Sequence, residues 1–316
     1  MVESAKLRGV FAAALTPLDA DLRPDIERFA AHCRWLLDNG CDGLAPLGTT
    51  GEANSLAVSD RVALIVGAAE AGLPMRRMIF GTGTPALHDT VMLSRAALEA
   101  GAGGLLLLPP FYYKNPSEEG LYATFSGLAE RIGDLNPRLY LYHFPQTSAV
   151  PVTLSLMARL REAFPGLFVG MKDSSGDFAN TKSFLDAFPG FEAFSGSEEL
   201  LLDNLSAGGP GCISATTNVT AHLAQRVHRA WKRGDGEAAE QAQGVAREAR
   251  RTLAQYPAIP ALKAVVAALR DDKAWLQMLP PQQKLDAAQT AALFVEMARF
   301  DGFAKLLAGG ARSAAG

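Results

Sequence analysis

Short apolar runs alternate with longer amphipathic stretches through most of the chain, and this alternation limits the possible folds more than any other feature. The amphipathic stretches at 25–39, 59–71, 88–100 and 117–132 start near acidic or hydroxyl residues, as helices do. The apolar runs indicate eight strands, at 9–15, 43–46, 78–82, 104–108, 139–142, 168–172, 191–195 and 211–214. Eight strands separated by helical crossovers predict the α/β class and a closed (β/α)8 TIM barrel.

An open, doubly wound parallel sheet is the competing fold for the same alternation. Such sheets often carry a glycine-rich dinucleotide fingerprint, and the nearest sequence here is Gly-Thr-Gly-Thr-Pro-Ala at 81–86. It has a proline where a helix should run, and it follows the third strand rather than the first. The sequence therefore favours the barrel over the open sheet.

Beyond the eighth unit the strand pattern stops, and helical stretches at 221–233, 236–255, 261–269 and 287–300 follow, with an interruption at 257–260. A Ser/Gly/Pro-rich linker does not separate these helices from the barrel. We expect residues 1–225 to form the barrel that carries the active site and 226–308 to form a C-terminal helical extension packed on it. We expect 309–316 to be a disordered tail.

The composition excludes several classes of partner. A net charge of −3 without any dense Lys/Arg run leaves no electrostatic footprint for nucleic acid or an anionic membrane, and the longest apolar runs are too short to span a bilayer. The five histidines show no ligand-like spacing, so we expect no metal site. The widely spaced Cys33, Cys41 and Cys212, with an N-terminus that lacks a secretory pattern, predict free thiols and a cytoplasmic protein.

Lys172 ends one of the apolar runs, and a turn-forming sequence at 173–177 follows it. Period-two alternation places Phe168, Gly170 and Lys172 on one face of the strand. Because the C-terminal ends of barrel strands form the active face, an amine held there is a candidate Schiff-base nucleophile. The alternative is a lysine whose stem packs while its ammonium group reaches solvent.

Other polar residues also stand at strand ends, where they would converge with Lys172 on one face of a barrel. They are the turn at 48–52, Tyr112 and Tyr113, Tyr142, Gly196 and Ser197, and Ser214. An amine nucleophile needs hydroxyl groups to move protons and donors to hold a carboxylate. Each of these strand-end residues has a structural explanation when it is taken alone. Their placement on one face together with Lys172 indicates a catalytic site.

These residues resemble the dihydrodipicolinate synthase and N-acetylneuraminate lyase superfamily of pyruvate-dependent class I aldolases. The matching motifs, in family order, are Thr16-Pro17, Gly48-Thr49-Thr50-Gly51-Glu52, Tyr112-Tyr113-Lys114-Asn115-Pro116-Ser117, Tyr142-His143-Phe144-Pro145, Gly170-Met171-Lys172-Asp173, Ser195-Gly196-Ser197 and Ile259-Pro260-Ala261-Leu262-Lys263. The complete set at family spacing is far more specific than any single motif. The resemblance implies a barrel enzyme, a lyase, that uses a covalent Schiff base and no separate cofactor.

The resemblance also implies catalytic roles. Lys172 would form the Schiff base with pyruvate or another 2-oxo acid, and Tyr142 would be the acid/base. Thr49 would link Tyr142 to Tyr113, which in many relatives enters from the neighbouring subunit. A tyrosine shared in this way predicts a homotetramer built from tight dimers.

The substrate-binding positions include one departure from the synthases. The positions that the resemblance implies are Gly48, Thr50, Thr147, Ser174, Gly196, Ser197, Glu198, Ile213 and Ser214. Thr50 and the N–H groups of its turn would hold the pyruvyl carboxylate. Synthases usually carry an arginine at the position of Thr147, where it binds the carboxylate of aspartate semialdehyde. A charged hydrogen bond of this kind is worth roughly 1.5 to 3 kcal/mol, so its loss disfavours that substrate. His143, where many relatives have asparagine, also points away from the synthase.

Three functional hypotheses stay open. The leading one is a lyase that reversibly cleaves a 2-oxo-3-deoxy acid, of the 2-keto-3-deoxy sugar acid type, to pyruvate and an aldehyde. The second uses the Schiff base for dihydrodipicolinate synthesis or for a dehydration. The third is a barrel that binds a 2-oxo acid without turnover, which the intact set of Lys172, Tyr142, Thr49 and Tyr113 disfavours.

Overall fold

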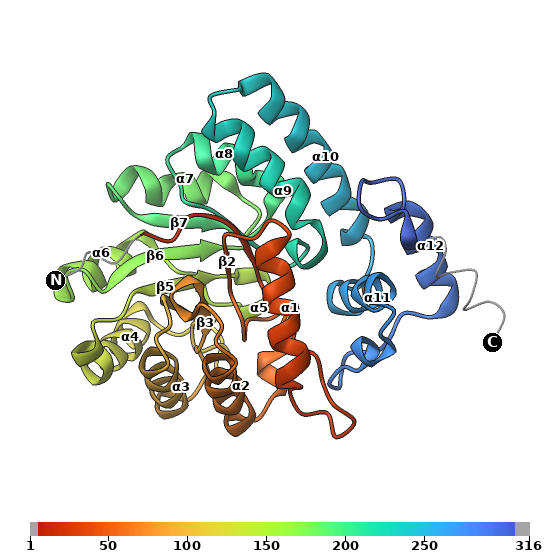
Figure 1. Ribbon diagram of the computed structural model, residues 1–316. Coiled ribbons are helices and arrows are strands. Elements are labelled where there is room, and N and C mark those ends of the chain that lie inside the picture. The colour runs from red at the N-terminus through yellow and green to blue at the C-terminus, as the bar shows by residue number, and fades with distance from the viewer. Residues whose placement is uncertain (1–5, 307–316) are drawn as a thin grey trace.

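Eight parallel strands form a closed barrel at the centre of the computed structural model, which describes residues 6–306 (Figure 1). The strands are β1 (Gly9–Ala12), β2 (Gly43–Leu44), β3 (Ile79–Gly81), β4 (Gly104–Leu107), β5 (Leu139–His143), β6 (Phe168–Asp173), β7 (Glu192–Ser195) and β8 (Gly211–Ser214). They pair in the order β2-β1-β8-β7-β6-β5-β4-β3, and a bridge between Leu44 and Met78 joins β2 to β3. The predicted TIM barrel is confirmed, and every predicted strand overlaps an observed one.

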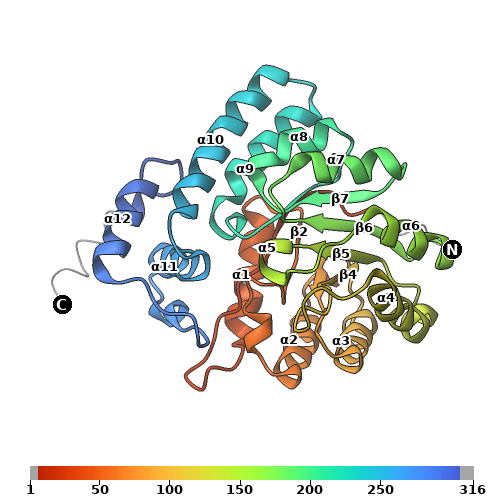
Figure 2. The same ribbon diagram turned by 180° about the vertical axis from the view of Figure 1, so that it is seen from behind.

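Helices surround the barrel, and three more form the C-terminal extension. The surrounding helices are α1 (Ile26–Asp38), α2 (Val58–Glu70), α3 (Leu87–Glu99), α4 (Glu118–Ile132), α5 (Pro145–Ser148), α6 (Leu154–Ala163), α7 (Phe178–Ala187), α8 (Leu201–Ser206) and α9 (Thr217–Lys232). The extension contains α10 (Gly236–Ala254), α11 (Ala258–Arg270) and α12 (Ala287–Met297). Figures 1 and 2 show α11 beside α1 and α10 along α9, so the extension covers one side of the barrel.

Aromatic side chains fill the inside of the barrel. Phe194 packs edge-to-face against Phe11 and Tyr140, with ring centroids 5.3 and 6.0 Å away. The phenol of Tyr140 donates to Glu192 at 2.5 Å, and Arg138 pairs with the same carboxylate at 2.6 Å. Each oxygen of the buried Glu192 carboxylate therefore accepts a hydrogen bond within the barrel.

A register shift in β6 changes which of its residues face inward. Leu139 pairs with Phe168, but the next residue, Tyr140, pairs with Gly170, so one residue of β6 is skipped. Phe168 lies in the outer core, and Val169 packs against the barrel interior. The prediction that Phe168 shares the face of Lys172 is therefore wrong, because period-two alternation does not hold across a bulge.

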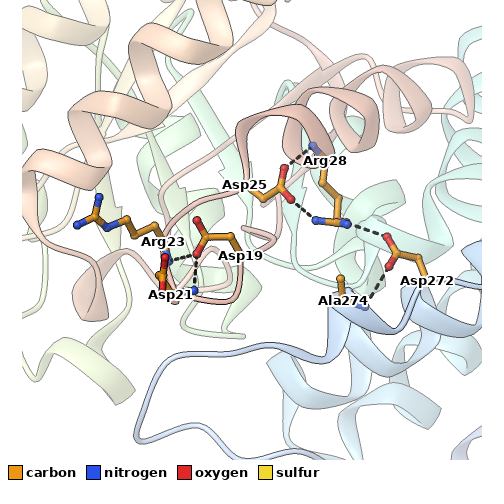
Figure 3. A network of polar contacts seen from close by, with 7 residues as sticks. All are labelled: Asp19, Asp21, Arg23, Asp25, Arg28, Asp272 and Ala274. Carbon is orange, nitrogen blue, oxygen red and sulfur yellow. Dashed lines mark hydrogen bonds and ion pairs between the residues drawn. The ribbon is translucent and has the colours of Figure 1, made fainter.

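One arginine ties the loop before α1 to the extension. Arg28 pairs with Asp25, the N-cap of α1, and its Nε donates to Asp272 at 2.7 Å (Figure 3). Asp272 also accepts from the backbone N–H of Ala274 at 3.0 Å, at the start of the 3₁₀ helix η5 (Lys273–Leu276). Asp19 closes the same loop by accepting from the N–H of Arg23. Because these groups are partly exposed, they orient the loop more than they stabilise the fold.

A buried histidine joins α1, α9 and α11. His32 accepts a hydrogen bond from Arg270 on Nδ1 at 2.9 Å, so its proton is on Nε2, which lies 3.0 Å from the side-chain oxygen of Asn218. The guanidinium of Arg270 lies 4.9 Å from the ring centroid of Trp35. Burial, and then the charge of Arg270, lower the pKa of His32 from 6.5 to about 3. The ring is therefore neutral in the folded protein.

The boundaries of the extension differ from the predicted ones. The hydroxyl of Thr217 donates to the carbonyl of Phe11 at 3.0 Å, so α9 packs on β1 and the predicted boundary at residue 225 falls inside this barrel helix. Helix α11 begins at Ala258 rather than after Pro260. Pro260 fits in the first turn because residues there need no N–H group for a hydrogen bond within the helix. The predicted tail, 309–316, lies outside the described residues.

The three cysteines are unpaired, as predicted. All three are buried, and burial raises the pKa of each thiol. Among residues 6–306, no single helix has the length and hydropathy to cross a membrane. Together α10 and α11 pass the test by length and composition, as a pair bent by 110°.

The pKa of His32 predicts a loss of stability in mild acid. The unfolded chain takes up a proton near the ordinary pKa of 6.5, whereas the folded chain takes it up only near 3. The contribution is fully present above pH 6.5 and is lost as the pH falls toward 3, by up to about 1.4 kcal/mol per pH unit. The free energy of unfolding can be measured with urea at several pH values between neutral pH and about pH 4. Plotted against pH, this free energy should change less steeply for His32→Gln than for the wild type. The exposed-histidine control His88→Gln should keep the wild-type slope, and equal slopes for all three proteins would contradict the assignment.

Candidate active site

Lys172 and Tyr142 lie side by side on neighbouring strands, where they are register partners in β6 and β5. The Nζ atom of Lys172 donates to the phenol oxygen of Tyr142 at 3.2 Å and lies 4.4 Å from the ring centroid. The two residues are only 5% and 4% exposed. This burial contradicts the alternative of a lysine whose ammonium reaches solvent, because the amine itself is held against an aromatic ring.

The phenol of Tyr142 has a lowered pKa. Burial raises the pKa, but the charge on Lys172 and side-chain hydrogen bonds with Thr49, Ser174 and Lys172 outweigh this effect. The hydroxyls of Thr49 and Ser174, from separate loops, therefore lie close to one phenol. Phe144 stacks on the ring of Tyr142, with centroids 5.7 Å apart. A phenol held in this way is suited to transfer protons.

The turn 48–52 after β2 is closed on itself and anchored to the end of β1. The backbone N–H of Gly51 bonds to the carbonyl of Gly48 at 3.1 Å, and the hydroxyl of Thr16 donates to the carbonyl of Gly51 at 2.8 Å. A Cβ on Gly51 would lie 2.9 Å from the carbonyl oxygen of Ala14, so the close approach requires glycine. The turn thus presents its donors in a fixed geometry.

A small cavity lies beside this turn. It is lined by Gly48, Thr49 and Tyr142, with Leu106 and Leu108 as apolar walls. Nothing lies within 4 Å of the point where a Cβ of Gly48 would stand, so the backbone there faces open space. The phenol of Tyr142 and the turn thus share the wall of a cavity that is about the size of a water molecule.

Gly196, directly after β7, lies against Ser174. A Cβ at this position would be 2.2 Å from the hydroxyl oxygen of Ser174, so only glycine leaves that hydroxyl room to reach Tyr142. Ser197 has a different function, because its hydroxyl accepts from a backbone N–H at 3.1 Å and caps the 3₁₀ helix η4 (Glu198–Leu200). Ser174 and Gly196 are thus at the site, whereas the Ser197 hydroxyl is engaged by its own helix.

Glu198 and Ser214 bond to one another and not to the cavity. The carboxylate of Glu198 is fully buried and accepts hydrogen bonds from the hydroxyls of Ser214, Thr216 and Thr220. Ile213 packs in the barrel interior, so the alternation along β8 directs Ser214 outward. The predicted substrate contacts of Glu198 and Ser214 are therefore corrected, since both side chains belong to the layer outside the barrel.

The chain matches the model of the Dihydrodipicolinate synthetase family over residues 6–293. It belongs to this family. An uncharacterized DapA-like lyase of Chloroflexus aurantiacus is 36% identical over 292 residues, which cover 91% of this chain and 96% of the relative. A 4-hydroxy-tetrahydrodipicolinate synthase of Rhodospirillum centenum is 34% identical over 229 residues, covering 72% of this chain and 76% of the relative.

The same family contains a close structural neighbour. The crystal structure of YagE, a prophage protein from E. coli K12 in complex with pyruvate, superposes with a TM-score of 0.83 at 26% identity, covering 92% of this chain and 97% of that one. As a member of the dihydrodipicolinate synthetase family, the chain is a lyase of the pyruvate-dependent class I aldolase type.

Two residues that the family resemblance assigns to the site lie on exposed segments. Thr147 is in the four-residue helix α5 after β5, and its side chain is exposed. Tyr113 is 80% exposed and packs edge-to-face on Tyr112, with ring centroids 5.2 Å apart. Within the described part of this chain, the partner of Tyr113 is therefore Tyr112 rather than Thr49.

Sequence reasoning missed how the neighbours of Tyr142 support it. Phe144, two residues along the strand direction, shares the inward face, and its spacing was a usable signal. His143 points the other way, where its Nδ1 accepts from the N–H of Val152 at 3.0 Å. Burial lowers the pKa of His143, although Asp173 nearby raises it. His143 is therefore part of the barrel wall and not of the cavity.

Proposed function

We propose that this protein is a Schiff-base aldolase that reversibly cleaves a 2-oxo-3-deoxy acid, of the 2-keto-3-deoxy sugar acid type, into pyruvate and a neutral hydroxyaldehyde. The pairing of buried Lys172 with Tyr142 at 3.2 Å carries the proposal. It places a nucleophile next to a proton carrier, as imine chemistry requires, and the proton carrier lines the cavity beside the turn. The pyruvate complex of the E. coli family member supports pyruvate as the 2-oxo acid.

In the proposed cleavage, the neutral amine of Lys172 attacks C2 of the substrate, and Tyr142 gives a proton to the leaving hydroxyl as water departs. The iminium that results draws the electron pair of the C3–C4 bond while the phenolate of Tyr142 takes the proton of the C4 hydroxyl, so the aldehyde leaves and an enamine remains. Tyr142 then gives this proton to C3, and water hydrolyses the imine to pyruvate and free Lys172 while one proton of the water returns to the phenolate. The lowered pKa of Tyr142 suits these repeated transfers.

The surrounding groups have separate roles in this proposal. Thr49 and Ser174 bond to the phenol and orient it. Thr50, which is 7% exposed, and the N–H groups of its turn hold the pyruvyl carboxylate, while the open space at Gly48 receives it. The turn supplies binding and the phenol supplies proton transfer.

The absence of an arginine at position 147 supports a neutral aldehyde. Thr147 has no charge to offer a second carboxylate. Arg159 pairs with Glu119 at 2.7 Å on the outer helices, and Arg161 donates to the carbonyl of Phe168 at the beginning of β6, so neither replaces it at the mouth.

The second candidate function is 4-hydroxy-tetrahydrodipicolinate synthesis. It is favoured by the relative of that name in Rhodospirillum centenum. The cation for the carboxylate of aspartate semialdehyde would then have to be Lys114, whose Nζ lies 3.4 Å from the carbonyl oxygen of Ser148 at the end of α5. This ammonium is the one cation that we find bonded to α5 among the described residues. It is held by backbone carbonyls, including that of Phe111, which leaves it poorly placed to bind a carboxylate.

Borohydride added with pyruvate should attach one reduced pyruvate to Lys172, as read by peptide mass mapping. Lys172→Met should trap none. Tyr142→Phe should still trap pyruvate but lose about 10²- to 10⁴-fold in kcat, because the phenol acts on protons in the transition state. Full activity with an unmodified Lys172 would sink the Schiff-base mechanism.

Acceptor preference distinguishes the two candidate functions. At saturating pyruvate, kcat/KM should favour glyceraldehyde over aspartate semialdehyde by about tenfold or more. Thr147→Arg should move this ratio toward aspartate semialdehyde, because it restores a countercharge, and the uncharged control Thr147→Val should not. A tenfold preference of the wild type for aspartate semialdehyde would favour the synthase, and Lys114→Met would then reduce only that activity.

We extend the proposal to assembly, because one chain does not complete the site. Tyr112 and Tyr113 together expose two aromatic rings, at 71% and 80%, on the loop before α4. A second copy of the chain that covers this pair would bring Tyr113 to Thr49 of the first copy and complete the relay. A homotetramer of two such dimers is the proposed form.

Mixing two inactive variants tests the shared site. Tyr113→Ala and Lys172→Met each lack one part, but a mixed dimer has one site with both parts intact. After subunit exchange of equal amounts, about one quarter of the wild-type activity should return if half of the dimers are mixed. No recovery in dimers that are shown to exchange, or an active monomer in sedimentation at assay concentration, would exclude the shared site.

A further inference from the structure

Glu52 and Lys263 form a fully buried ion pair between the turn 48–52 and helix α11. The Nζ atom of Lys263 donates to Glu52 and to the carbonyl oxygen of Gln277, the latter at 2.7 Å. The second carboxylate oxygen of Glu52 accepts from the N–H of Leu279 at 2.7 Å. The side chains of Lys263 and Glu52 are 0% and 1% exposed, so this pair joins the extension to the turn beneath the protein surface. Buried pairs of this kind define geometry more reliably than they add stability.

The backbone of the turn needs such support. Glu52 has a φ of +55° and Leu47, just before the turn, a φ of +57°. Left-handed backbone is unfavourable for a residue with a Cβ, so surrounding contacts must maintain it. On the barrel side Thr16 bonds to Gly51, and on the extension side Lys263 bonds to Glu52. The end of the turn is therefore held by one contact from the barrel and one contact from the extension.

We infer that Lys263 is a positioning residue, which through Glu52 fixes the turn on which Thr49 and Thr50 act. The inference rests on the proposed function, because the roles of these two threonines make the position of the turn matter. If the turn shifts, Thr50 leaves the pyruvyl carboxylate and Thr49 leaves Tyr142. Pyruvate binding and proton transfer should then weaken together.

The chain contains a matched control for a merely structural role. Arg138 and Glu192 form another buried ion pair, at 2.6 Å, with the phenol of Tyr140 as a third member. Glu192 begins β7 and Arg138 precedes β5, so this pair lies at the ends of the strands opposite to the catalytic face. Its removal should cost stability without moving the turn.

The experiment compares the full-length double variants E52Q/K263M and R138M/E192Q with the wild type. The measurements are the pyruvate concentration for half-maximal borohydride trapping, kcat, and Tm as a check of folding. E52Q/K263M should need about tenfold more pyruvate and lose about tenfold in kcat, whereas Lys263→Arg, which keeps the charge, should stay within about threefold of the wild type. R138M/E192Q should match the wild type in both constants despite a lower Tm.

The outcomes separate this inference from the proposed function. A wild type that traps no pyruvate contradicts the proposed function itself. A wild type that traps pyruvate, with a folded E52Q/K263M whose constants match those of R138M/E192Q, contradicts only the positioning role. If E52Q/K263M does not fold, Glu52→Gln alone keeps an acceptor for Lys263, and its half-maximal pyruvate concentration should rise by about threefold. An unchanged value in that variant overturns the inference.

Discussion

In β6 two residues stand opposite one residue of β5, and the position of the Lys172 amine depends on this register shift. Phe168 faces the surrounding helices, so strict alternation from it would send Gly170 and Lys172 outward as well. The bulge reverses the parity, and Gly170 then leaves room for the ring of Tyr140, which a Cβ would approach to 2.7 Å. The pairing of Lys172 with Tyr142 is a consequence of that shift.

The C-terminal extension contacts the barrel along α1 and at the turn that follows β2. Lys263 contacts Glu52 after β2, Arg270 contacts His32 on α1, and Asp272 contacts Arg28 at the start of the same helix. The contact of Lys263 with Glu52 is buried on both sides, Arg270 is half-buried where it meets the buried His32, and the contact of Asp272 with Arg28 is partly exposed. We expect the buried contact to hold its geometry most firmly. The extension therefore contacts both α1 and the turn 48–52.

The motifs of the sequence located the strand ends that meet on one face of the barrel, because strand ends are read from local composition. Lys172, Tyr142 and Thr49 stand where apolar runs open into turns, and the barrel brings them together. The same reasoning failed for Glu198 and Ser214. A turn glutamate and a strand-end serine have the same local signal whether they face a cavity or a buried cluster of hydroxyls.

The sequence by itself determined the number and order of the βα units, the barrel they form and the residues at their ends, because hydrophobic period and turn chemistry are local properties. Only the tertiary structure decided which of those residues meet. The bulge that turns Lys172 inward and the ion pair that links Glu52 to Lys263 both join segments from different parts of the chain. Such pairings depend on register and packing between elements, which the residues of one element do not specify.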